Sequence, residues 1–192
     1  MASKDQLTTT EYAVLGLLSD GERSGYDLAG LAARTIEDIW VPSRSQIYRV
    51  LPRLVRWGLA ESREIEQQGR PDKALYRITD HGLDVLRAWV ERVVEDPAGG
   101  VNVFFLKLFF AAVAPPEAAQ AQLDAYRQVV ERRLRELEDM ERNLPADASV
   151  YDQIALRHGI TRTRATLAWA HEAEAALQRA HAGAIKDMRK AL

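Results

Sequence analysis

The segment SRSQIYRVLPRLVRWG, residues 43–58, decides the fold of the N-terminal half of this chain. Ser43 followed by Gln46 is the capping-box pattern that begins a helix, and Gly58 is typical of the position just past a helix end. The apolar residues between them recur at i, i+3, i+4 and i+7, which is the spacing of one buried helix face. These apolar residues are Ile47, Val50, Leu51 and Leu54.

The opposite face of this predicted helix is basic, because residues 39–60 include four arginines and no acidic residue. A helix fits the major groove of B-DNA, where the side chains of its first turn can contact base edges. Arginine pairs with guanine, glutamine pairs with adenine, and hydroxyls contact bases or phosphates. The residues of this helix expected to contact DNA are Ser43, Arg44, Ser45, Gln46, Tyr48, Arg49 and Arg53.

Pro52 lies inside the predicted helix. Proline lacks the backbone donor of an interior helical residue and crowds the carbonyl one turn earlier, at a cost of about 3 kcal/mol in a straight helix. We therefore expect a kink at this position. The first turn precedes the kink and keeps its orientation, whereas the orientation of Arg53 and Arg56 stays open.

Two further helices are expected before this segment. Thr8 with Glu11, and Ser24 with Asp27, repeat the capping-box spacing, and Gly21 separates the two helices. Apolar residues at helical spacing follow each start, so both helices are expected to bury one face.

A β-hairpin and a fourth helix follow. Residues 67–72 are turn-forming and separate residues 59–66 from a short strand at residues 74–78, and Thr79 then begins a helix. Three helices, a hairpin and a fourth helix are the elements of a winged helix-turn-helix domain, in which the hairpin is the wing. The wing residues expected to contact phosphates or the minor groove are Arg70 and Lys73.

The turn-forming residues 96–100 are the expected domain boundary. We predict a mainly α fold with a winged helix-turn-helix domain over residues 1–95 and an all-helical domain over residues 101–192. The second domain begins with a nearly apolar helix at residues 101–114, and a seven-residue apolar repeat follows it. This apolar surface exceeds what one small bundle needs to cover, which predicts a homodimer. The repeat consists of Leu123, Val130, Leu137 and Leu144.

Aromatic residues near the expected dimer region are candidates for a small-molecule effector pocket. Most aromatic residues of this kind are core residues, and that alternative stays open for each of them. The four candidates are Trp89, Phe105, Phe109 and Trp169.

The composition narrows the class of protein. The 192 residues include no cysteine, which excludes disulfides, cysteine-bound metals and thiol catalysis and fits a reducing compartment. The net charge of −2 differs from that of a protein that coats nucleic acid without specificity, so the local basic segment matters more. Residues 101–114 are too short to span a bilayer. We expect a cytoplasmic protein with no membrane span.

The motifs of the first domain resemble those of the PadR family of bacterial transcription regulators. The resemblance covers residues 10–86 and is looser after the linker. It implies a homodimeric repressor that binds a palindromic operator in double-stranded DNA and releases it on binding a small molecule or receiving another signal. Ser24 and Tyr26 complete the expected DNA contacts. The matching motifs are YAVLGLL (residues 12–18), SGYDL (24–28), IY (47–48), GRP (69–71) and YRIT (76–79).

Two alternative functions remain at this stage: a winged-helix module that binds protein, and an enzyme or metal protein built in the C-terminal helices. His158, His171 and His181 lack the i, i+4 spacing of a ligand pair, and the sequence has no glycine-rich phosphate loop or serine elbow. We therefore expect no catalytic activity, cofactor or metal. Salt-sensitive binding to a short duplex separates DNA binding from protein binding.

Overall fold

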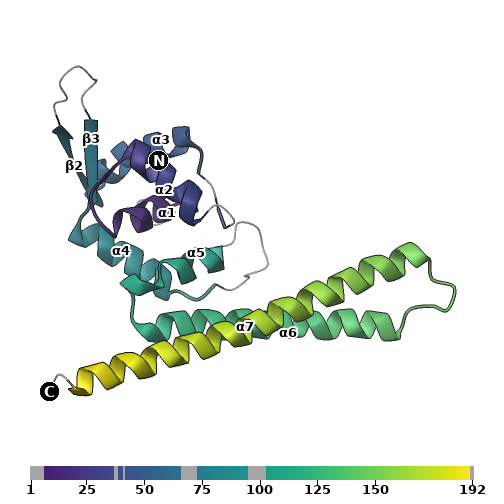
Figure 1. Cartoon of the computed structure of the whole chain (residues 1–192). Coiled ribbons are helices and arrows are strands. Elements are labelled where there is room, and N and C mark those ends of the chain that lie inside the picture. The colour runs from purple at the N-terminus through teal and green to yellow at the C-terminus, as the bar shows by residue number, and fades with distance from the viewer. Residues whose placement is uncertain (1–6, 37–38, 41, 66–72, 95–102, 191–192) are drawn as a thin grey trace. The chain divides into compact units, whose positions relative to one another are not determined.

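Figure 1 shows the computed structural model, which describes residues 7–36, 39–40, 42–65, 73–94 and 103–190, with residues 182–190 as backbone only. The chain divides into two compact units. The first consists of Met1–Arg92 and Gly99–Ala118, and the second consists of Val93–Ala98 and Ala119–Leu192.

The first unit contains the predicted helices and hairpin. The second predicted helix ends at Thr35, and Ile36 and Trp40 in the turn after it pack against the core. The helices are α1 (Thr9–Leu18), α2 (Gly25–Thr35), α3 (Arg44–Arg56), α4 (Asp80–Glu91) and α5 (Val103–Phe109), followed by the 3-10 helix η1 (Ala111–Val113). The strands are β1 (Arg23–Ser24), β2 (Ala60–Ile65) and β3 (Lys73–Ile78).

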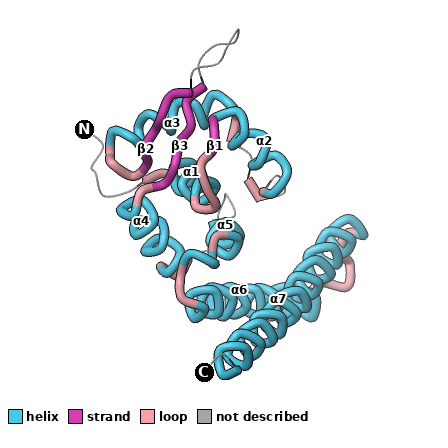
Figure 2. Tube along the Cα trace, turned by 60° about the vertical axis from the view of Figure 1, so that its left-hand side comes forward, coloured by secondary structure: helices cyan, strands magenta, loops and turns pink. Residues whose placement is uncertain are grey.

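The three strands form an antiparallel sheet in the order β1-β3-β2, as Figure 2 shows. Ala60 pairs with Ile78 in the predicted hairpin, and Arg23 of β1 pairs with Tyr76 on the other side of β3. The two residues of β1 are too few to show an alternating pattern, so this strand was not predictable from the sequence. This short strand fixes the start of α2 against the base of the wing.

The predicted helix starts are confirmed. Thr8, Ser24, Ser43 and Thr79 each accept a hydrogen bond from the backbone N–H three residues later, and the first three form full capping boxes. Helix α3 continues through Pro52, which is exposed, so the first turn and the last turn belong to one helix. The predicted apolar face of α3 is buried, with Ile47, Val50, Leu51 and Leu54 each at most 4% exposed.

Helix α5 packs with the first unit, although the sequence analysis assigned residues 101–114 to the second domain. Gly16 of α1 makes this packing feasible, because a Cβ there would lie 2.6 Å from the ring of Phe110. Leu106 and Phe110 join the core of the first unit. A nearly apolar helix needs cover on most sides, and the glycine in α1 allows the close approach that provides it.

Lys107 is a buried cation of α5. Its ammonium donates to the backbone carbonyl of Arg92, just past the end of α4, and lies 5.2 Å from the centre of the Trp89 ring. Burial, and then the nearby charge of Arg92, lower the pKa of Lys107 to about 8. The contact with the carbonyl joins α5 to the end of α4, where a cation is favourable because the helix carbonyls point toward it.

In the second unit, α6 (Pro116–Arg142) and α7 (Val150–Lys190) lie side by side and antiparallel in Figures 1 and 2. Leu123, Val130 and Leu137 of the seven-residue repeat are buried. A Cβ on Gly159 of α7 would be 3.6 Å from Leu137, and the Tyr126 and Trp169 rings meet edge to face at 6.0 Å. Three of the four repeat residues are therefore covered within the second unit, and Leu144 is half-buried.

Candidate nucleic-acid interface

The first turn of α3 presents only exposed side chains. Ser43 and Gln46 form the predicted capping box in this turn. The Gln46 N–H donates to Ser43 Oγ at 3.2 Å, and the Ser43 N–H donates to Gln46 Oε1 at 2.8 Å. Adenine recognition by glutamine needs one acceptor and one donor, and this acceptor is already engaged. Gln46 therefore keeps its amide donors for DNA. The exposed residues of this part of α3 are Ser43, Arg44, Ser45, Gln46, Tyr48 and Arg49.

Two tyrosines connect the starts of α2 and α3. Tyr26 is 64% exposed, and the guanidinium carbon of Arg44 lies 5.5 Å from the centre of its ring. Tyr48 is 53% exposed, and a Cβ on Gly25 would lie 2.7 Å from its ring. Gly25 therefore allows α3 to approach the start of α2. Tyr26 and Arg44 are therefore neighbours on the surface, whereas Ser24, another predicted contact, is only 4% exposed and its hydroxyl donates to Asp27.

Lys73 at the base of the wing is part of the same surface. Its ammonium donates to Asp27 Oδ2 at 2.9 Å, and the Ser24 hydroxyl donates to the same oxygen at 2.7 Å. The Ser24 hydroxyl, and then Lys73, hold the pKa of Asp27 below its ordinary value. Lys73 is 37% exposed, so it can reach a phosphate only by sharing or leaving Asp27. Arg70, the other predicted wing contact, lies outside the described residues.

Arg53 has partners inside the first unit. One of its guanidinium nitrogens lies 2.7 Å from Glu11, whose side chain is only 1% exposed, and its guanidinium carbon is 4.9 Å from the Trp57 ring centre. Glu11 also accepts from the Thr8 N–H at 2.6 Å. The carboxylate is thus shared between the cap of α1 and α3. Sequence reasoning identified Glu11 only as a capping residue, because nothing local indicates a partner in α3.

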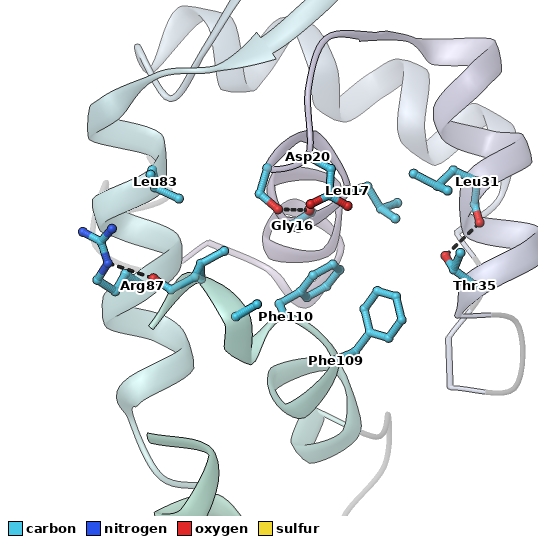
Figure 3. Close-up of a pocket in the computed structure, with 12 residues that line it drawn as sticks. Gly16, Leu17, Asp20, Leu31, Thr35, Leu83, Arg87, Phe109 and Phe110 are labelled. Carbon is cyan, nitrogen blue, oxygen red and sulfur yellow. Dashed lines mark hydrogen bonds between the residues drawn. The ribbon is translucent and has the colours of Figure 1, made fainter. Parts of the chain in front are cut away.

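A cavity of about 550 Å³ lies in the first unit among α1, α2, α4 and the α5–η1 segment (Figure 3). The lining is mainly apolar, and Arg87 crosses one side, where its Nε donates to the Val113 carbonyl at 2.9 Å. Asp20 and Ser19 supply polar atoms near the end of α1. The apolar side chains in the lining are Leu17, Leu31, Leu83, Phe109, Phe110, Ala112 and Val113.

The four aromatic residues of the predicted effector pocket have different surroundings. Phe109 lines the cavity and is 46% exposed. Trp89 stacks on Tyr12 at 4.5 Å, and Phe105 meets Phe104 edge to face at 4.9 Å. Trp169 belongs to the second unit. The structure therefore brings Phe109, but neither Trp89 nor Phe105, to the lining of this cavity.

The sequence of elements, the sheet with its wing and the exposed first turn of α3 define a winged helix-turn-helix transcription regulator. The PadR-like transcriptional regulator family model matches residues 14–88, and a model described as the C-terminal region of virulence activator alpha matches residues 102–178. No described helix is both long enough and apolar enough to cross a membrane.

Two curated proteins and one solved structure to which this chain is similar are the following. The negative transcriptional regulator PadR of Bacillus subtilis is 30% identical over 131 residues, covering 68% of this chain and 70% of that protein. A probable transcriptional regulator of Mycobacterium tuberculosis is 29% identical over 182 residues, covering 87% and 96%. A crystal structure of B. subtilis PadR with operator DNA has 25% identity and a TM-score of 0.48, covering 88% of this chain and 99% of that one. The chain belongs to the PadR-like family of transcriptional regulators, which are DNA-binding proteins and not enzymes.

Proposed function

We propose that the protein is a repressor that binds a palindromic operator as a homodimer and releases it when a small molecule binds. The observation that carries this proposal is the first turn of α3, where every side chain is exposed while the following apolar face is buried. A rigid helix with a polar, basic first turn suits insertion into the major groove. Tyr26 and Arg44 extend the surface toward the start of α2.

The second unit supports the dimer. Two antiparallel helices can cover one face of each other, and this pair leaves large apolar side chains in solvent. A second copy would cover such side chains and would place two recognition helices on half-sites about 34 Å apart, one turn of B-DNA. The exposed apolar residues of these helices and the loop end between them are Met140 (53% exposed), Val150 (58%), Tyr151 (79%) and Ile154 (62%).

The cavity of the first unit supports the release step. Its mainly apolar walls, with Arg87 and Asp20 at the edges, suit a small hydrophobic molecule that carries a polar group. Leu31 and Thr35 of α2 form one wall, and α2 also carries Tyr26. A ligand that binds better to one position of α2 than to another would shift the protein between states of different operator affinity.

The test uses the full chain and an operator selected by this protein from a random duplex library. Footprinting should protect two symmetric half-sites, and sedimentation should show a complex with two copies of the chain. Binding as a single copy to an asymmetric site would contradict the dimer. For the release step, Leu31→Trp should fill the cavity and abolish the response to any small molecule that lowers operator affinity, while Leu167→Trp in α7 should keep the response.

A further inference from the structure

A second hollow, of about 320 Å³, opens beside α2 and is lined by three arginines, one tyrosine, one glycine and one aspartate. Arg23 lies at β1, Arg34 lies in the last turn of α2, and Arg44 begins α3. Neither Arg23 nor Arg34 was among the residues that the sequence analysis expected to contact DNA. The lining residues are Arg23, Tyr26, Asp27, Gly30, Arg34 and Arg44.

The face of α2 explains how these residues come together. Arg23, Asp27, Gly30 and Arg34 follow the i, i+4, i+7 and i+11 spacing of one helix face, continued from the preceding strand. Gly30 keeps the middle of this face open, because a Cβ there would lie 3.2 Å from a terminal nitrogen of Arg34. The Arg34 side chain therefore reaches back across the glycine into the hollow.

The charges in the hollow are unbalanced. Within the described part of the chain, no carboxylate pairs with Arg23, Arg34 or Arg44, and the Nε of Arg23 is buried without a hydrogen-bond partner. Asp27, the one acidic residue in the lining, already accepts from Ser24 and Lys73.

Arginines elsewhere on the same unit differ in this respect. Arg63 donates to Glu22 at 2.7 Å, and Arg77 donates to Glu61 at 2.8 Å. Guanidinium groups that gather without a carboxylate paired to them, in a chain whose net charge is −2, favour an anion that they can bind with several parallel N–H groups.

We infer that this hollow binds a phosphate group, and that the phosphate belongs to the operator backbone beside the base pairs contacted by α3. The inference rests on the proposed function. Arg44 connects the hollow to the base-contacting helix. It lines the hollow and lies over Tyr26, and it also belongs to the first turn of α3. A phosphate held by Arg23 and Arg34 fixes the position of α2 on the duplex and leaves base recognition to α3.

The main experiment measures operator affinity against salt for the full chain and for Arg34→Gln, a change on the exposed part of the hollow. Losing one phosphate contact should lower the slope of log K against log salt by about 0.9 for each half-site while the preferred sequence stays the same. Arg132→Gln, which removes an exposed arginine of α6, is the charge-matched control and should keep the wild-type slope. An unchanged slope in Arg34→Gln overturns the inference.

A second measurement locates the phosphate. A series of operators is prepared, each with a single phosphate replaced by an uncharged methylphosphonate. At one position per half-site this replacement should lower the affinity of the wild-type protein but not the affinity of Arg34→Gln. Arg23→Gln should show the same insensitivity at that position, and its circular dichroism and melting temperature verify that it folds. Equal losses for wild type and both variants at every position overturn the assignment.

The last measurement distinguishes a free anion from DNA. Melting temperatures are compared in inorganic phosphate and in chloride of equal ionic strength. If phosphate stabilises wild type but not Arg34→Gln, and the salt slope of operator binding is unchanged, the hollow binds a free anion and the operator assignment is wrong. If the wild-type protein binds no duplex at low salt, the proposed function itself fails, and the phosphate melts still report whether the hollow is an anion site.

Discussion

Arg44 and Arg53 occupy opposite ends of the same helix and differ in what surrounds them. Arg44 is exposed and lies over the ring of Tyr26, which is itself in solvent. Arg53 lies against a carboxylate that is 1% exposed and over the ring of Trp57. Both belong to the same basic face in the sequence pattern. The side chain of Arg44 is open to solvent, whereas that of Arg53 holds α3 against α1.

The largest expected effect is on folding, and it comes from Arg53. Arg53→Ala leaves the buried Glu11 carboxylate without its cation, which should lower the free energy of unfolding by about 2–3 kcal/mol, less than the about 3–5 kcal/mol of a fully buried pair because Arg53 is 39% exposed. Urea denaturation measures the change.

Two further variants separate charge from packing. Glu11→Gln combined with Arg53→Ala should recover much of the loss, because a neutral amide is less costly to bury and its oxygen can still accept from the Thr8 N–H. Arg56→Ala, at an exposed position of the same helix end, should change stability by less than about 0.5 kcal/mol. Equal losses in Arg53→Ala and Arg56→Ala would remove the distinction between the two ends of α3.

The next effect is on DNA affinity. Arg44→Ala should weaken binding to the selected operator by about 1–3 kcal/mol and relax the preference at one symmetric pair of positions, because the proposed function makes Arg44 a base-contacting residue. Stability should change little, since Arg44 is exposed. Fluorescence titration at fixed salt, together with a thermal melt, measures both quantities. Wild-type affinity in this variant would show that the first turn of α3 lies outside the groove.

The local part of this architecture follows from the sequence. A capping box uses residues three apart, and a buried helix face uses a fixed spacing, so Thr8, Ser24, Ser43 and Thr79 were recognisable as helix starts. The pairing of Arg53 with Glu11 joins residues far apart in the chain and has no local signal. The same holds for Phe110, whose packing against Gly16 moves α5 into the first unit.

In the candidate interface, too, local features were predictable and contacts were not. The exposed first turn of α3 could be predicted from its pattern, whereas the hydrogen bonds and contacts of each side chain could not. The sequence assigned Gln46 both to the capping box and to adenine recognition, and in the structure its acceptor is engaged in the capping box. No sequence pattern marks Arg34 as a functional residue. Its side chain reaches the hollow beside α2 because Gly30 has no side chain in the way.

Gln46 should therefore show a mixed effect. Gln46→Ala removes half of the capping box, so we expect a loss of about 0.5–1 kcal/mol in the free energy of unfolding in addition to any loss of operator affinity. Gln46→Glu keeps an acceptor for the Ser43 N–H and should retain the stability while lowering DNA affinity through charge repulsion. If Gln46→Ala melts like wild type, the box contributes nothing and Gln46 is free for adenine.

The smallest expected effect concerns Asp27, which lies at the junction of α2 and the wing. Its folded pKa is lowered, so the stability that it contributes is present above its unfolded pKa of about 3.9 and is lost as the pH falls through the folded value. The carboxylate is 44% exposed, which limits this contribution to about 0.2–0.5 kcal/mol. Urea denaturation at pH 7 and pH 3 should show a smaller acid loss for Lys73→Ala than for wild type, and the smallest for Ser24→Ala, because the Ser24 hydroxyl is the larger cause of the shift. A Lys73→Ala protein with a smaller acid loss than Ser24→Ala would reverse this order and make the wing lysine, instead of the helix cap, the main partner of Asp27.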